Sequence, residues 1–168
     1  SAPHFRSQYD KLIAERDTSD VWRQFALWFL IDPDHGVIRF TKPDSPEYRV
    51  IKHVARLYDE NCKDRNAWRK ATSAAKAAAS ADTAADDDDD DFYVVWADTA
   101  DTAWSGYAAY NAYYAAKAAY VAAHAADAAY YASCAVFYAA AGATAAAYKH
   151  MAEKLLELLQ LAPPKENV

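Results

Sequence analysis

Six consecutive aspartates, at positions 86 to 91, are the most unusual group of ionisable side chains in this 168-residue chain. So many carboxylates suit either a divalent cation or a basic protein surface, to which they would offer an acidic ridge resembling phosphates. Consecutive side chains point around a helix or alternate along a strand, so six in a row cannot all ligate one ion. We therefore expect a solvated loop or an acidic docking patch for a partner protein. The patch would comprise Asp86, Asp87, Asp88, Asp89, Asp90, Asp91, Tyr93 and Trp96.

Other residue types that could carry catalysis do not form a recognisable site. The five histidines are scattered, and none sits in a catalytic motif. His124 and Asp127 are three residues apart, which favours a hydrogen-bonded pair in a helix seam. Cys134 lies among alanines and is interpreted as a small buried apolar side chain rather than a nucleophile. Asp32, Asp34 and His35 lie in a turn that contains Pro33 and Gly36, and their spacing fits no standard metal loop. We expect no catalytic residue, no metal and no cofactor.

An alanine-rich stretch from residue 105 to residue 148 must position any such site, because it is the longest regular pattern in the chain. Larger residues, mostly tyrosine, recur every three or four positions, which places them on one stripe of a helix. Alanine is the best helix former, and its small side chain lets helix axes approach closely. The pattern predicts antiparallel helices packed alanine face to alanine face, with tyrosines in the seams. Turns are expected at Ser105–Gly106 and Gly142, and one between His124 and Asp127 is left open.

A gap between such helices would be lined by tyrosine hydroxyls. This arrangement could hold a small polar or nucleotide-like ligand, and it is the alternative to a protein-docking function. The residues that would line the gap are Tyr107, Tyr110, Tyr113, Tyr114 and His124.

The length, net charge, uncharged segments and cysteines of the chain limit the classes of protein to which it can belong. The length fits one domain, and the net charge of −6 argues against direct nucleic-acid binding, which requires a basic footprint. Residues 128–148 are uncharged and long enough to span a bilayer. They are alanine with several aromatic residues rather than leucine or isoleucine, so no membrane association is expected. Cys62 and Cys134 are far apart, and no disulfide is indicated, which favours a reducing cytoplasm.

The remaining segments have the residue patterns of helices. The sequence therefore predicts an all-α fold, either an antiparallel helical bundle or stacked helical hairpins. Residues 5–16 are amphipathic, and residues 21–31 form an aromatic core helix after cap chemistry at 17–20. Residues 37–40 are expected to be extended, without a sheet. Ser45 and Pro46 begin a helix to residue 59 that turns Arg49, Lys52 and Arg56 outward. Asp64 begins the next helix, and residues 92–104 are another candidate. A single domain divides into aromatic-rich (4–63), alanine-rich (64–148) and C-terminal (149–161) parts.

Four features together resemble a known group of proteins. They are the helix after Asp44-Ser45-Pro46, the WRKA sequence at 68–71, the AAxxAAYxA repeats and the closing AYKHMAEKLLELL at 147–159. Over roughly residues 20–160 the chain resembles alanine-rich repeat proteins of bacteria and phages labelled as immunity proteins. The aspartates and the many tyrosines depart from that group, in which arginine, tryptophan and single aspartates are commoner.

The resemblance implies a protein that binds and neutralises another protein without chemistry, and it brings no catalytic residues with it. We therefore expect a non-catalytic inhibitor of immunity or counter-defence type, whose partner has a basic surface. Self-association is also open, because an alanine face can pair between chains as well as within one.

Overall fold

The computed structural model describes residues 2–82, 100–121, 130–132, 134–136 and 145–166. Its helices are α1 (Ala2–Glu15), α2 (Val21–Ile31), the 3₁₀ helix η1 (Val37–Phe40), α3 (Pro46–Asp59), α4 (Arg65–Asp82), α5 (Ala100–Tyr120) and α7 (Ala145–Leu161). Residues 130–132 and 134–136 are also helical. The described ranges contain no strand, only an isolated bridge between Arg16 and Pro164. The all-α prediction is confirmed.

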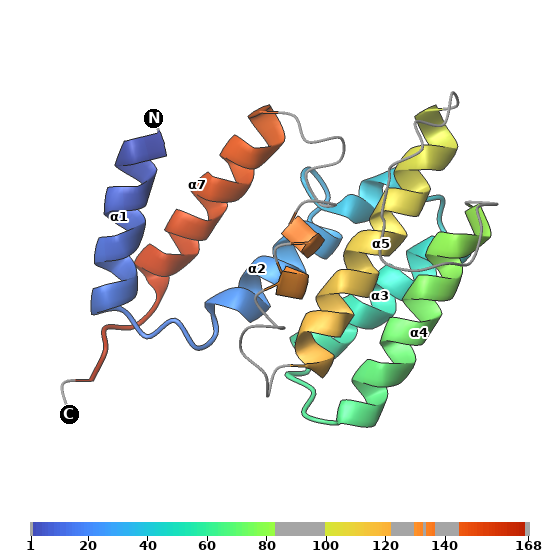
Figure 1. The fold of residues 1–168 in the computed structure, drawn as a ribbon, viewed down its shortest axis with the longest axis horizontal. Helices are drawn as coiled ribbons and strands as arrows, with labels where there is room; N and C mark the ends of the chain where they lie inside the picture. The colour runs from blue at the N-terminus through green and yellow to red at the C-terminus, as the bar shows by residue number, and fades with distance from the viewer. Residues whose placement is uncertain (1, 83–99, 122–129, 133, 137–144, 167–168) are drawn as a thin grey trace.

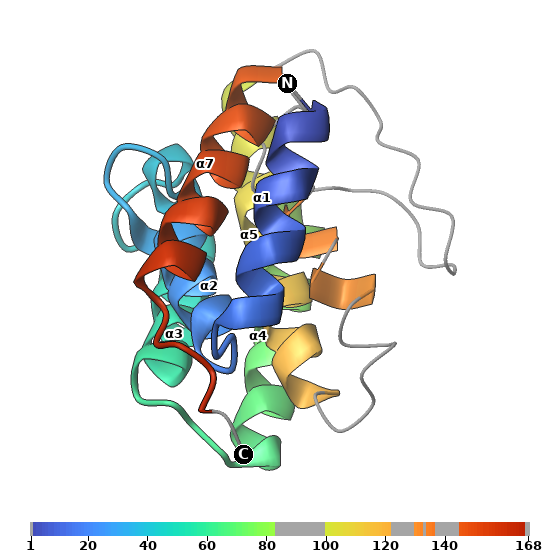
Figure 2. The ribbon, with the colours of Figure 1, turned by 90° about the vertical axis from the view of Figure 1, so that its left-hand side faces the viewer.

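The helices form two groups on either side of α2 (Figure 1). On one side α1 and α7 lie next to each other, in both views, and run in the same direction (Figures 1 and 2). On the other side α3, α4 and α5 pack together, each antiparallel to the next (Figure 1). The short link between α3 and α4 forces the antiparallel hairpin, because neighbouring helices joined by few residues must reverse direction.

The central helix α2 carries several of the large apolar side chains of the core. Phe25, Phe29 and Leu30 are almost fully buried, and the bounds of α2 match the predicted segment. The predicted cap is wrong, because the Asp20 side chain makes no capping hydrogen bond. Its carboxylate instead accepts two hydrogen bonds from the Arg23 guanidinium, at 2.5 and 2.8 Å. The charged guanidinium is a stronger donor than a neutral amide, and the carboxylate also accepts a hydrogen bond from the Gln24 side chain at 2.8 Å.

Replacing Asp20 with asparagine is expected to lower the free energy of unfolding at neutral pH by about 0.5–1 kcal/mol, since solvent screens this partly exposed pair. The hydrogen bond from Arg23 lowers the pKa of Asp20 from 3.8 to about 2. A depressed pKa stabilises the fold above the unfolded value and loses this effect as pH falls through the folded one. Urea unfolding should show the difference between wild type and variant shrinking from about pH 4 to about pH 2. A difference that stays constant over that window would contradict the assignment.

Both ends of α3 follow from local sequence. The Ser45 hydroxyl oxygen accepts a hydrogen bond from the Tyr48 amide at 3.1 Å, and Pro46 occupies the first turn. After Asp59 the chain reverses through Asn61, whose φ is 51°. The Cys62 amide then donates to the Leu57 carbonyl, which is the bond that closes a Schellman motif. The predicted bounds of this helix are confirmed.

The α4–α5 pair confirms the alanine packing. Fully buried alanines on both helices form the contact: Ala71, Ala75 and Ala79 on α4, and Ala108, Ala112, Ala115 and Ala116 on α5. The tyrosines of α5 whose side chains are described are half-buried. The predicted turn at Ser105–Gly106 is wrong, since α5 is continuous from Ala100 to Tyr120. One glycine costs a helix interior only about 1 kcal/mol, and the surrounding alanines sustain the helix.

The predicted extended segment at residues 37–40 is also wrong. These residues form η1, in which the Thr41 amide donates to the Ile38 carbonyl. No strand of the described chain lies beside them, so a 3₁₀ turn satisfies amides that an extended segment would leave unpaired. The turn before η1 folds tightly onto the end of α2. A Cβ at Gly36 would lie 2.5 Å from the Asp32 amide nitrogen, so glycine is required there.

The C-terminal helix α7 begins at Ala145, four residues before the predicted start at 149. Met151, Leu158 and Leu159 are buried, whereas Leu161 is 73% exposed. No described helix is both long and apolar enough to cross a membrane. Cys62 and Cys134 are free thiols.

Candidate functional site

The tyrosines of α5 form a ring cluster beside the alanine contact. The rings of Tyr113 and Tyr114 meet edge to face at 4.8 Å, and Tyr114 stacks on Tyr131 at 6.2 Å. The Lys117 amine lies 5.5 Å from the centre of the Tyr131 ring. Burial raises the pKa of Tyr114, so its hydroxyl stays protonated at any physiological pH. The contacts among these three rings fill the space beside the alanine contact.

Two members of the predicted tyrosine site are less fully described. Tyr107 belongs to α5, but its side chain is outside the described part of the structure, and His124 lies outside it altogether, as does Asp127. Tyr110 is half-buried and packs against Ala78, Ala79 and Ala109. The two cavities described below are both lined by other residues.

A buried amide interrupts the alanine face of α5. Asn111 is fully buried, and its Nδ2 donates a hydrogen bond to the Ala135 carbonyl at 2.7 Å. Its Oδ1 has no hydrogen-bond partner within the described residues. The bond fixes the short helical stretch at 134–136 onto α5, which gives Asn111 a structural role. Cys134, in the same stretch, is half-buried rather than fully buried.

Tyr58 links three helices through its hydroxyl group. The Trp22 indole N–H of α2 donates to this oxygen at 3.1 Å, and the hydroxyl donates to the Ala115 carbonyl of α5 at 2.7 Å. The ring meets Trp68 of α4 edge to face at 4.8 Å. Burial raises the pKa of Tyr58 well above its ordinary value, so the hydroxyl remains a donor. This group of hydrogen bonds around the Tyr58 hydroxyl, here called the Tyr58 hub, lies in the core.

Two histidines meet where the turn after α2 approaches α7. The rings of His35 and His150 are 5.3 Å apart, and His35 stacks on Trp28 at 5.5 Å. Asp32 Oδ1 accepts hydrogen bonds from the backbone amides of Asp34 and His35 at 3.0 and 2.9 Å, which confirms the predicted turn. Within the described residues no group of three or more potential ligands could hold a metal ion.

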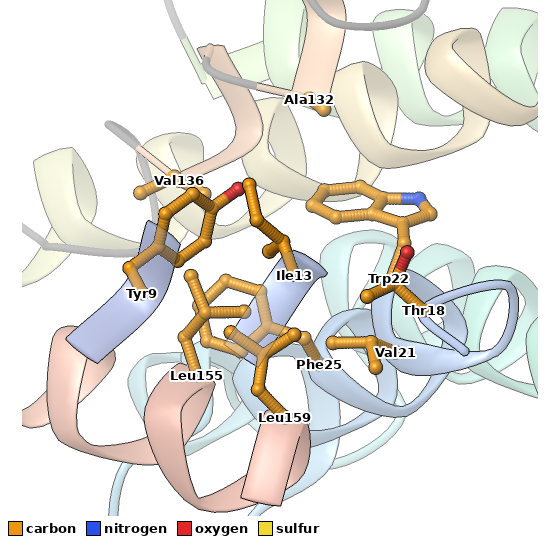
Figure 3. A pocket seen from close by; sticks show the side chains of 10 residues that line it. All are labelled: Tyr9, Ile13, Thr18, Val21, Trp22, Phe25, Ala132, Val136, Leu155 and Leu159. Carbon is orange, nitrogen blue, oxygen red and sulfur yellow. The ribbon is translucent and has the colours of Figure 1, made fainter. Parts of the chain in front are cut away.

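An apolar cavity of about 310 Å³ opens where α1 and α7 meet α2 (Figure 3). Its walls come from these three helices, the link between α1 and α2, and two residues of the short helical stretches before α7: Tyr9, Ile13, Thr18, Val21, Trp22, Phe25, Ala132, Val136, Leu155 and Leu159. The Trp22 ring lies along the cavity while its nitrogen points away from the centre (Figure 3). Only the hydroxyls of Tyr9 and Thr18 supply side-chain polarity close by, so the cavity can bury an apolar group but cannot bind a charged one.

A second, larger cavity of about 610 Å³ is a groove along the outer side of α3. Its lining is unexpectedly basic for a chain with a net charge of −6: Ile31, Tyr48, Arg49, Lys52, His53, Ala55, Arg56 and Asp59. The sequence predicted that the three cations face outward, but it did not reveal a groove. The spacing of three and four residues was the visible signal, whereas the contribution of Ile31 from α2 depends on tertiary packing.

The predicted docking patch lies outside the described residues, because the aspartate run (residues 86–91), Tyr93 and Trp96 all fall between Asp82 and Ala100. The structure does describe the two helices that this segment joins, α4 and α5.

Comparisons with protein-family models, with curated proteins and with solved structures find no match to this chain.

Proposed function

We propose that this protein is a non-catalytic protein-binding inhibitor, which docks the aspartate run, Tyr93 and Trp96 on a basic surface of its partner. The observation that carries the proposal is the position of the run in the chain. It joins α4 and α5, the two helices that pack through fully buried alanines. A docking segment anchored at both ends to a well-packed helical pair loses less conformational entropy on binding than a free tail does.

The chemistry of the segment suits this role. Six adjacent carboxylates attract a basic surface over a distance of about 8 Å at physiological salt, which accelerates the encounter. Charge alone contributes little net affinity at an exposed interface, so the adjacent Tyr93 and Trp96 would act as the anchors. A partner with an anion-binding site, such as an enzyme that acts on phosphate-containing substrates, fits this combination. Inhibition would then follow from occupation of that site.

A ligand site among the tyrosines of α5 receives less support. Tyr113, Tyr114 and Tyr131 contact one another, and both cavities have other linings. Protein docking therefore remains the better proposal.

A pull-down from the native host tests the proposal. Changing all six residues of the aspartate run to asparagine is expected to weaken capture of the partner by about tenfold or more, because the electrostatic attraction is lost. A matched control removes six exposed acids elsewhere, which changes the formal net charge of −6 to zero in the same way. It carries the corresponding amides at Asp10, Glu15, Asp34, Glu60, Glu153 and Glu157. An unchanged set of captured proteins in the run variant, or equal loss in both variants, would refute a specific acidic docking site.

A further inference from the structure

The outer side of α3 carries a row of cations with a defined shape. Arg49, Lys52 and Arg56 are exposed and follow each other at steps of three and four residues, so they project from one side of the helix. With half-buried His53 they line the groove of about 610 Å³. The apolar part of its lining includes Ile31, which is 37% exposed at the end of α2. The groove therefore combines positive charge with an apolar wall.

The charges in the groove are only partly compensated. Arg56 donates a hydrogen bond to His53 Nδ1 at 3.0 Å, and its Nε lies 4.0 Å from a Glu60 carboxylate oxygen. Within the described part of the chain, Arg49 and Lys52 make no hydrogen bond or ion pair through their side chains. Asp59 is the only acid among the lining residues. An anionic occupant could therefore form ion pairs with Arg49 and Lys52, and it could share the charge of Arg56 with Glu60.

The chain itself contains a segment of complementary charge, the aspartate run. The same chain is poorly placed to fill its own groove, because the opposite side of α3 packs on α4 and α5. Ile51 and Val54 are fully buried on that inner side, whereas the cations project outward. In the chain the run joins α4 and α5, which both pack against α3. A second copy of the chain approaches the outer side without this restriction.

We propose that the α3 groove binds the aspartate run of a second copy, so that two chains associate through two equivalent run–groove contacts. Such an exchange is self-complementary, as a two-fold dimer requires. The cation row spans ~10 Å along the helix, whereas six extended residues span ~20 Å. About three aspartates therefore engage one groove. The inference does not depend on the proposed function, but it implies that self-association and partner binding compete for the same run.

Sedimentation velocity of the full chain over a range of concentrations tests this. In about 50 mM salt the wild type should dimerise as concentration rises, and about 500 mM salt should weaken the dimer severalfold. The triple variant Arg49→Glu, Lys52→Glu and Arg56→Glu should weaken dimerisation at least tenfold. The control variant Arg69→Glu, Lys70→Glu and Lys76→Glu changes the net charge equally at exposed positions of α4, outside the groove. It should behave as the wild type does.

A charge exchange makes the test specific. Lysines at positions 86–91, combined with the groove triple variant in one chain, should restore the dimer that the groove variant alone loses. Circular dichroism of each variant checks that the helices are intact. A wild type that stays monomeric in low salt, or a dimer that both triple variants weaken equally, would overturn the inference. Because groove variants retain the run, they should still capture the partner in the pull-down, so failure of self-association leaves the proposed function standing.

Discussion

Replacing Ala75 with leucine is expected to lower the free energy of unfolding by about 3 kcal/mol, since three extra carbon atoms must enter a close-packed contact. Ala75 of α4 is 0% exposed and belongs to the same buried cluster as Ala108 and Ala112 of α5. Alanine faces bring helix axes to the short end of the usual ~8–10 Å spacing, so a leucine cannot be accommodated without separating the helices. Thermal unfolding should show a loss of about 6–12 °C in the midpoint for a chain of this length.

The neighbouring Ala74 provides a matched control. It lies on the same helix but is exposed. The Ala74→Leu substitution has the same effect on helix propensity, and it should change stability by no more than about 0.5 kcal/mol. Comparable losses at both positions would show that α4 does not pack on α5 through Ala75.

Replacing Tyr58 with phenylalanine is expected to cost about 2 kcal/mol. The change removes one oxygen that serves two bonds, from Trp22 at 3.1 Å and to the Ala115 carbonyl at 2.7 Å. Tyr58 is 5% exposed, so water cannot easily replace the lost hydroxyl. Most of the cost therefore comes from leaving a buried donor and a buried acceptor without partners.

Urea unfolding of a double-mutant cycle measures this effect. Trp22→Phe removes the donor, so the combined substitutions should cost less than the sum of the single ones by about 0.5–1 kcal/mol. Tyr48→Phe, on the same helix at a half-buried position, is the control and should change stability by less than about 0.5 kcal/mol. Strict additivity, or a loss at Tyr48 equal to that at Tyr58, would exclude the three-helix link.

These two sites explain how the scaffold keeps its shape around the proposed binding elements. The alanine contact fixes α4 to α5, and the Tyr58 hub ties α3 to α2 and α5. The aspartate run joins the first pair, whereas the basic groove lies on α3. A loss of packing at Ala75 should therefore affect partner capture and self-association together, since both use the run, whereas loss of the Tyr58 hydroxyl should first affect self-association.

Local signals in the sequence predicted the elements well. Ser45 and Pro46 define the start of α3 because a capping hydroxyl and a proline act within one turn. The bounds of α2 follow from its run of large apolar residues. The failures lie where another side chain competes for the capping group, as Arg23 does at Asp20, or where the described chain offers no partner strand, as at residues 37–40. The turn predicted at Gly106 does not form because the small cost of one glycine in a helix is outweighed by the helix propensity of the alanines around it.

The sequence by itself determined that the chain is helical, that alanines form its closest contacts and that tyrosines lie beside them. It could not distinguish Ala75, which is buried, from Ala74, which is exposed, because identical methyl groups carry no amphipathic contrast. Only the packing of α4 on α5 makes that choice. The same holds for the groove, where the row of cations is visible in the sequence but Ile31 joins it only because α2 packs on α3. Helix formation depends on neighbours in the chain, whereas a surface with a partner's shape requires segments that meet only in space.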